Sequence, residues 1–250
     1  MLERLLERIS LSEYKDNLIL KGGFLIASMV GMDTRATMDM DVTIKGEPVN
    51  PDNLKKMFDE IIQISVEDDI AFEYKNISEI REGDDYNGYR AHLIANFAPM
   101  AVPLKLDITT GDKITPKEIQ YEYKAMFGEK SIYVLAYNLE TVMSEKLETI
   151  FSRGDQTTRP RDYYDIYILW KLQQKNINLD HLESALKATA DKRNSLKLMK
   201  QYQNTMSVVR GSEFMQEQWQ KYQRSFDYAK EISFEETCEV VIDLMEKLEL

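Results

Sequence analysis

The sequence predicts an α+β protein with a mixed β-sheet in its N-terminal part and a helical bundle in its C-terminal part. Two observations support this. Between residues 38 and 136, several short segments alternate apolar and polar side chains, which is the pattern of half-buried strands. From Asn138 onward, apolar residues recur only at helical spacing. We therefore expect two domains, residues 1–137 and 138–250.

Apolar spacing and turn residues place the elements of the first domain. A helix is expected over residues 2–16, and a second helix follows the Gly22-Gly23 pair and ends at Gly31. Further along come a strand at 38–44, whose apolar face would be Met38, Met40, Val42 and Ile44, and a helix at 51–65. Strands are expected at 72–81, 89–97, 102–110, 119–123 and 132–136, with turn residues at 82–88.

Helices account for the second domain. Asn138 is a suitable N-cap for a helix reaching Ile150, and others are expected from Arg161 and over 182–190, 196–209, 213–230 and 234–248. Residues 187–230 are rich in lysine and arginine and carry Tyr202, Trp219, Tyr222 and Phe226. Such a segment could stack on RNA bases. The commoner arrangement places the aromatic rings in the core and the lysines in water.

Composition limits the possible function classes. The chain has 250 residues, 43% hydrophobic and 30% charged, with a formal net charge of −11. This acidity argues against non-specific coating of nucleic acid, which needs many basic contacts to phosphate. The apolar runs are too short to span a bilayer, and the single Cys238 excludes an intrachain disulfide. We expect a cytoplasmic protein without a membrane partner, and its oligomeric state stays open.

Two aspartates are the first candidate site residues. Asp39 and Asp41 are two apart in a predicted strand, so their side chains project from the same face. Adjacent carboxylates repel each other unless a cation lies between them, and Mg²⁺ held by carboxylates and substrate phosphates suits such a pair. A solvated strand face is the alternative. Gly22 and Gly23 favour the site, because glycines at a helix N-terminus allow phosphate to approach the backbone.

A third carboxylate lies on another predicted strand. In residues 102–110, Leu104, Leu106 and Ile108 face one way, whereas Lys105 and Asp107 face the other. If this strand lies beside Asp39 and Asp41, Asp107 could complete a site for two metal ions. The alternative is that Asp107 simply faces solvent.

The helical part contains a second charged motif. Arg161, Asp162 and Asp165 are spaced three and four apart, so they can share one helical face. Glu145 and Lys146 lie on the preceding helix. On spacing alone, the structural alternative is favoured, in which acidic residues start the helix and an ion pair forms along it.

Together these motifs resemble a known family. The glycine pair followed by paired acids is the layout of the nucleotidyltransferase superfamily that includes polymerase β. The full set, in order, resembles the AbiEii/AbiGii nucleotidyltransferase toxins of type IV toxin–antitoxin and abortive-infection systems. The matching segments are Lys21-Gly22-Gly23, Arg35-x-Thr37-x-Asp39-x-Asp41, Leu104 to Ile108, Glu145-Lys146-Leu147 and Arg161 to Asp165.

The resemblance implies roles for individual residues. Asp39, Asp41 and Asp107 would bind Mg²⁺, and Lys146 would reach the triphosphate as a positive charge. Asp165 would act beside them in catalysis. The nucleotide would be bound by Lys21, Gly22, Gly23, Arg35, Arg161 and Asp162. Many superfamily members have a hydroxyl residue at or just after the glycine pair, whereas Phe24 follows it here, so backbone groups would bind the phosphates.

The implied activity is Mg²⁺-dependent transfer of a nucleoside monophosphate from an NTP to a hydroxyl group, such as the 3′ end of a tRNA. An antitoxin protein is the implied partner. Two alternatives stay open from the sequence. The same site could nucleotidylate or phosphorylate a small molecule or a protein, or the fold could be a non-catalytic nucleotide-binding module.

Overall fold

The computed structural model describes residues 1–80, 88–126 and 130–250. The chain forms two compact units, and each is assembled from several segments. The first unit comprises Met1–Met29, Ala36–Asp112 and Glu118–Tyr137, and the second comprises Val30–Arg35, Lys113–Lys117 and Asn138–Leu250. Two short segments from the N-terminal half of the chain therefore belong to the helical unit.

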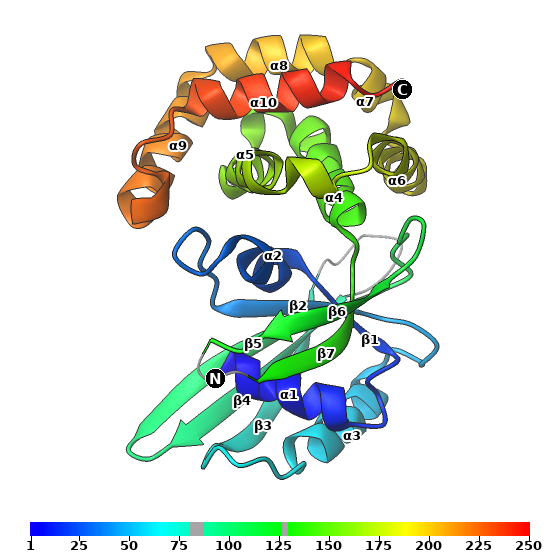
Figure 1. Ribbon diagram of the computed structural model, residues 1–250, viewed down its shortest axis with the longest axis vertical. Helices are drawn as coiled ribbons and strands as arrows, with labels where there is room; N and C mark the ends of the chain where they lie inside the picture. Colours follow the sequence, from blue (N-terminus) through cyan, green and yellow to red (C-terminus); the bar gives the residue numbers. More distant parts are fainter. Residues whose placement is uncertain (81–87, 127–129) are drawn as a thin grey trace. The chain divides into compact units, whose positions relative to one another are not determined.

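The first unit is built on a mixed sheet, in which the described residues form seven strands in the order β3-β4-β5-β2-β1-β7-β6 (Figure 1). The strands are β1 (Leu18–Lys21), β2 (Asp39–Ile44), β3 (Ala71–Ile80), β4 (Gly88–Phe97), β5 (Met100–Thr110), β6 (Ile119–Lys124) and β7 (Ser131–Ala136). β2 pairs in parallel with β5, as β1 does with β7, and the other pairs are antiparallel. The mixed sheet that the alternating pattern predicts is confirmed.

The central strand β2 carries the paired aspartates. Met40, Val42 and Ile44 are buried, whereas Asp39 and Asp41 are partly exposed on the other face. The prediction that Met38 lies in the core is wrong. Met38 precedes the strand and is 80% exposed. The alternating pattern continues through Met38, but the strand pairing does not.

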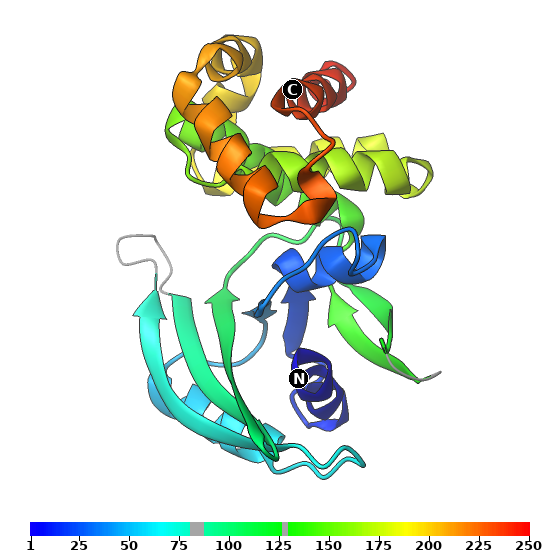
Figure 2. The same cartoon turned by 90° about the vertical axis from the view of Figure 1, so that its left-hand side faces the viewer.

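Helices α1 (Leu2–Leu11) and α3 (Pro51–Ile62) cover part of this sheet (Figure 2). α1 contacts β7 and α3, and α3 contacts β3. α1 ends earlier than expected, because the Ser12 hydroxyl donates to the carbonyl of Ile9 at 2.8 Å and the chain turns there. α2 (Gly22–Val30) follows β1 directly. The expected turn at 82–88 lies, apart from Gly88, outside the described residues.

The second unit is helical. Its helices are α4 (Leu139–Arg153), α5 (Arg161–Gln173), α6 (Leu179–Lys192), α7 (Leu196–Lys200), α8 (Tyr202–Gly211), α9 (Glu213–Ser225) and α10 (Phe234–Glu246). α4 packs on α5 and α6, and α10 packs on α5 and α8. The helix expected at 196–209 is broken at Gln201 into α7 and α8, and the one expected at 213–230 ends at Ser225.

Two of the four aromatic residues of the basic segment, Trp219 and Tyr222, lie in the core of the helical unit. Trp219 is 2% exposed and Tyr222 is 7% exposed. The indole N–H of Trp219 donates to the carbonyl of Ile232 at 3.0 Å, and the ring of Tyr222 lies 4.8 Å from that of Phe226. These contacts favour the core interpretation over a surface for stacking RNA bases.

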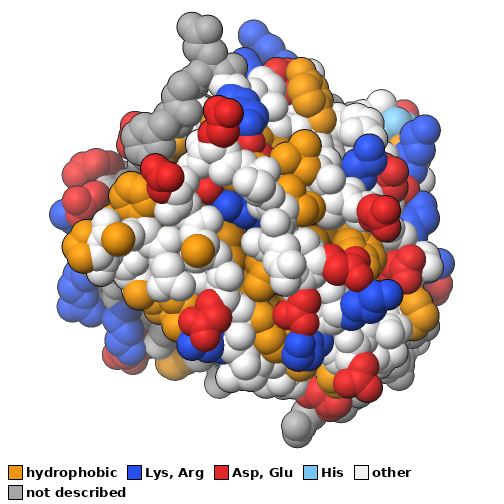
Figure 3. Space-filling view, turned by 90° about the horizontal axis from the view of Figure 1, so that it is seen from below, with side chains coloured by type: hydrophobic (Ala, Val, Ile, Leu, Met, Phe, Trp, Pro, Cys, Tyr) orange, Lys and Arg blue, Asp and Glu red, His pale blue; other side chains and the backbone are white. Residues whose placement is uncertain are grey.

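The charged side chains on one face of the molecule are of mixed sign. On the face drawn in Figure 3, lysine and arginine side chains are interspersed with acidic ones, and its described atoms form no broad area of one charge. Among the described residues, no helix is both long and apolar enough to cross a bilayer.

Asn138 fixes the start of α4. Its side-chain oxygen accepts a hydrogen bond from the Thr141 amide at 2.7 Å, as expected of an N-cap. Its amide nitrogen also donates to the carbonyls of Thr115 and Lys117, at 2.9 and 2.8 Å. One buried side chain therefore caps the helix and holds the segment 113–117.

We expect Asn138→Ala to lower the free energy of unfolding by about 2 kcal/mol, because it removes a cap and two further hydrogen bonds to the carbonyls of Thr115 and Lys117. Asn50→Ala is the matched control. Asn50 caps α3 through one bond to the Asn53 amide but is exposed, so a loss of about 1 kcal/mol is expected. Urea unfolding followed by circular dichroism measures both, and equal losses would contradict the second role of Asn138.

Candidate active site

Four charged residues form a row across the central strands. In register, Arg90 on β4 lies opposite Asp107 on β5, Asp107 opposite Asp41 on β2, and Asp41 opposite Lys21 on β1. Residues opposite each other in a ladder share one face of the sheet. The row therefore reads cation, carboxylate, carboxylate, cation. Asp39 lies two residues before Asp41 and opposite Lys105.

The glycine at the start of α2 lies against the acid pair. Gly22 has φ +67°, and a Cβ placed on it would lie 2.1 Å from Oδ2 of Asp41. Only glycine permits this approach without moving the carboxylate. The structure thus brings together the Gly22-Gly23 helix start and the aspartates of β2, as the sequence motif suggests. A helix N-terminus favours phosphate through its open backbone N–H groups.

Arg90 binds Asp107 in a bidentate ion pair. Nε lies 2.6 Å from Oδ1 and Nη2 lies 2.7 Å from Oδ2. The hydrogen bonds that Arg90 donates to Asp107 raise the pKa of Arg90 above its usual value, and the negative charges of Asp107, Asp39 and Asp41 add to this effect. Asp107 therefore already has a cation, and the guanidinium lies within the field of all three acids.

The Arg90–Asp107 ion pair affects how the face that carries Asp39 and Asp41 could bind a divalent cation. Across residues 1–80, 88–126 and 130–250, no three Asp, Glu, His or Cys side chains are grouped closely enough to hold a metal ion. Asp107 is paired with Arg90, and its expected role as a third metal ligand stays a prediction. Asp39 and Asp41 on their own match the usual Mg²⁺ arrangement of one or two carboxylates completed by phosphate and water.

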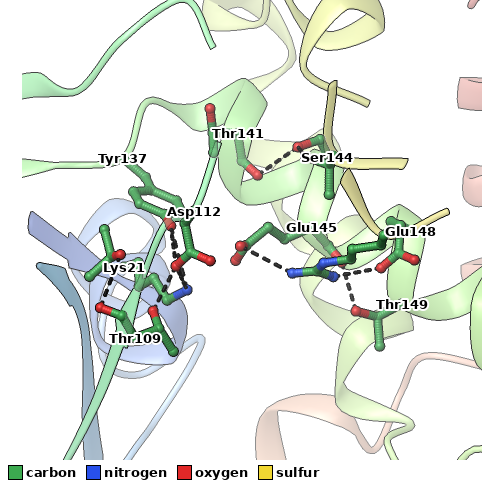
Figure 4. Close-up of polar contacts among 12 residues, drawn as sticks. Lys21, Thr109, Asp112, Tyr137, Thr141, Ser144, Glu145, Glu148 and Thr149 are labelled. Atoms are coloured by element: carbon green, nitrogen blue, oxygen red, sulfur yellow. Dashed lines mark hydrogen bonds and ion pairs between the residues drawn. The ribbon is translucent and has the colours of Figure 1, made fainter. Parts of the chain in front are cut away.

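Lys21 belongs to a second buried cluster (Figure 4). Its Nζ lies 2.6 Å from the carboxylate of Asp112, which also accepts hydrogen bonds from Thr109 at 2.6 Å and Tyr137 at 2.9 Å. Burial alone would raise the pKa of Asp112, but the charge of Lys21 and these bonds hold it well below its usual range. Lys21 is 4% exposed, so its ammonium holds the end of β1 just before Gly22.

The charged motif of the helical unit forms a buried network. Lys146 Nζ lies 2.6 Å from Asp162 and 2.9 Å from Asp165. Arg35 Nε lies 2.6 Å from Asp165, and Arg159 Nε lies 2.8 Å from Asp162. Two carboxylates and three cations are thus interleaved. An ammonium has three N–H donors, so these two contacts do not use all of the donors of Lys146.

Burial and pairing act in opposite directions on these pKa values. Burial would raise the pKa of Asp165, but the charges of Lys146 and Arg35 outweigh it and leave that pKa below its usual value. Burial would likewise lower the pKa of Lys146, but the two carboxylates raise it. Asp165 and Lys146 are therefore both charged in the folded protein at neutral pH.

The remaining predicted residues divide between the two units. Arg35 and Asp162 lie in the buried helical network, whereas Arg161 is exposed at the first turn of α5. Glu145 contacts Arg193, with 3.3 Å between the charged groups (Figure 4). Sequence reasoning missed Arg90, Asp112 and Arg159. Arg90 had a detectable signal, because pairing the predicted strands 89–97 and 102–110 as a hairpin places it opposite Asp107. Arg159 had one too, because it lies three residues before Asp162.

Comparisons with known proteins identify relatives of the whole chain. A family model described as nucleotidyl transferase AbiEii toxin of a type IV toxin–antitoxin system matches residues 4–240. The crystal structure of JHP933 from Helicobacter pylori is similar, with a TM-score of 0.53 and 17% sequence identity, over 99% of this chain and 90% of that one. A second H. pylori structure, of a proposed nucleotidyltransferase, gives the same values with 92% of that chain covered. No curated protein matches.

We expect Gly22→Ala to lower the free energy of unfolding by more than backbone strain at this position alone would. Gly46→Ala is the control, because Gly46 has φ +81° but a Cβ there meets Asn17 only at 3.4 Å. Either substitution forces an alanine into the left-handed region, at about 1–2 kcal/mol. Gly22→Ala must also displace Asp41. Urea unfolding should show the larger loss for Gly22→Ala, and equal losses would contradict the close approach.

We expect Asp165→Asn to destabilise the helical unit by about 3–5 kcal/mol at pH 7, because it leaves buried cations short of a counter-charge. The pKa of Asp165 is lower in the folded chain, so its contribution is complete above the unfolded pKa of about 3.9 and is lost as pH falls below it. The stability of the variant should therefore depend less on pH between 5 and 3.

Urea unfolding across that pH range, followed by circular dichroism, measures both effects. Glu183→Gln is the matched control, because Glu183 pairs with Lys187 at 2.7 Å on the surface of α6. No measurable change is expected for it, since exposed ion pairs contribute little. An Asp165→Asn protein as stable as the wild type at pH 7 would argue that the network is not needed for folding.

Proposed function

Because the chain belongs to the AbiEii family of nucleotidyltransferase toxins from type IV toxin–antitoxin systems, we propose that it transfers a nucleoside monophosphate from an NTP to an acceptor hydroxyl, with Mg²⁺ as cofactor. The observation that carries this proposal is the placement of Asp39 and Asp41 on β2, with the Asp41 carboxylate against Gly22 at the start of α2. An acid pair beside an open helix N-terminus is suited to a metal-bound triphosphate.

In this proposal, Asp39 and Asp41 hold the metal. When bound, Mg²⁺ would neutralise charge on the phosphates and on the leaving pyrophosphate. The backbone N–H groups around Gly22 and Gly23 would hold phosphate oxygens, since Phe24 offers no hydroxyl. Lys21 would fix the position of this turn through its ion pair with Asp112. The chemistry of such a transfer is mainly positioning and charge neutralisation.

The second group of charges lies within the helical unit. We propose, from the family resemblance, that Lys146 and Arg35 are the cations that bind the nucleotide, with Asp162 and Asp165 holding their side chains in place. Arg161 at the exposed start of α5 would be available to a nucleotide or to an acceptor. Removal of Asp165 would then misplace two cations together.

The acceptor and the partner are the finer parts of the proposal. We propose the 3′ end of a tRNA as the acceptor, and growth arrest as the consequence. The family supports a cognate antitoxin protein as the partner that restrains the toxin. A small-molecule or protein acceptor is the alternative chemistry of the same site.

The test uses purified protein, Mg²⁺, total tRNA and each α-³²P-labelled NTP in turn. We expect label on RNA with at least one nucleotide, and a loss of about 100- to 1,000-fold in Asp39→Asn and Asp41→Asn, which remove metal-binding charge without changing shape. Asp52→Asn is the control, because Asp52 is an exposed carboxylate in the first turn of α3.

Each outcome has one meaning. Label on protein or on a small molecule, lost in the same variants, would keep the enzyme and replace the acceptor. Full activity in either aspartate variant would overturn the metal assignment. If no acceptor is labelled and isothermal titration shows binding of Mg²⁺ and NTP, the protein is a nucleotide-binding module and not a transferase.

A further inference from the structure

Arg90 is a basic residue on the acidic face that the family resemblance does not account for. Its side chain is 34% exposed, and that of its partner Asp107 is 19% exposed. It comes from β4, which lies outside the motifs that suggested the site. A guanidinium that pairs with a carboxylate through two parallel hydrogen bonds is held in a fixed orientation. Arg90 is therefore a permanent cation on this face.

The position of this cation relates to metal binding. Asp107 is directly opposite Asp41 in the parallel ladder, so a metal ion bridging the two would be the second ion of a two-metal site. The guanidinium uses both oxygens of Asp107. A divalent ion at the same carboxylate would have to displace Arg90 or lie beside its charge, and both are unfavourable.

We infer that Arg90 takes the place of a second metal ion, so that the site binds a single exchangeable divalent cation at Asp39 and Asp41. This inference rests on the proposed function and specifies its metal stoichiometry. Arg90 would be a positioning residue: it holds Asp107 on the acidic face and offsets the repulsion between Asp107 and Asp41. The site would then resist occupation by two ions at any physiological Mg²⁺ concentration.

The experiment is a titration of Mn²⁺ into the metal-free full-length protein, with free Mn²⁺ measured by electron paramagnetic resonance. We expect one ion per chain in the wild type and none in Asp39→Asn/Asp41→Asn. Arg90→Gln should bind a second ion, at a Kd at least about tenfold lower than any second ion in the wild type. The double variant Arg90→Gln/Asp107→Asn should return to one ion.

Two further variants separate the guanidinium from general charge. Lys105→Gln removes the same charge from the same face of β5 but leaves the Arg90–Asp107 pair, so it should still bind one ion. Arg90→Lys keeps the charge without the bidentate geometry, and it should also bind one ion. Thermal melting gives an independent measure: without metal, Arg90→Gln should melt lower than Lys105→Gln, and Mn²⁺ should raise its melting temperature more.

The outcomes distinguish this inference from the function on which it rests. Two ions per wild-type chain, together with nucleotidyl transfer, would overturn the role of Arg90 and keep the enzyme. One ion in both the wild type and Arg90→Gln, with unchanged Kd, would also overturn it. No Mn²⁺ binding and no transfer in the wild type would overturn both. A gain of a second ion in Lys105→Gln would show that net charge, and not Arg90, sets the stoichiometry.

Discussion

The parallel pairing of β2 with β5 is the constraint on which the proposed site depends. It sets Asp41 directly opposite Asp107, and like charges at opposite positions of a ladder destabilise the sheet. Arg90 on the next strand, β4, is in register with Asp107, and its positive charge offsets this repulsion. The β4–β5 hairpin therefore supplies a cation that offsets the repulsion between the two carboxylates.

In each unit, buried charged side chains form ion pairs with residues of the same unit or of its border. In the sheet unit, Lys21 and Asp112 form an ion pair that is completed by hydroxyl groups of neighbouring residues. In the helical unit, Lys146 is shared between two aspartates. Buried ion pairs are costly to assemble and more costly to leave incomplete, so they fix geometry more than they add stability. The Lys21–Asp112 pair fixes the residue just before Gly22, and the Lys146 pairs fix Asp162 and Asp165 of the second charged motif.

The sequence predicted what depends on local pattern. Alternation at 38–44 and 102–110 correctly placed the carboxylates of β2 and β5 on the face opposite the core, and Asn138 correctly marked the start of α4. Alternation could not show where pairing begins, so Met38 was misplaced. It also could not show that the helix at 196–209 breaks at Gln201, since the apolar spacing continues across the break.

Long-range pairing was beyond the sequence. Asp112 matters because of Lys21, which is 91 residues away in the sequence, and each of the two aspartates bound by Lys146 is at least sixteen residues away. The motifs correctly named charged residues that gather in the fold. They could not reveal that Lys146 and Asp107 already have partners within the chain, because a motif records residue types and not the ion pairs that those residues form.

The interleaving of the two units has a practical consequence for dissecting the protein. A cut after Tyr137 looks natural on the sequence, yet the fragment 138–250 would lack residues 30–35 and 113–117, which belong to the helical unit. Asp165 would lose the guanidinium of Arg35, and Asn138 would lose the two carbonyls it binds. No single cleavage of the backbone separates these units into complete halves, so the protein is best expressed and studied as one chain.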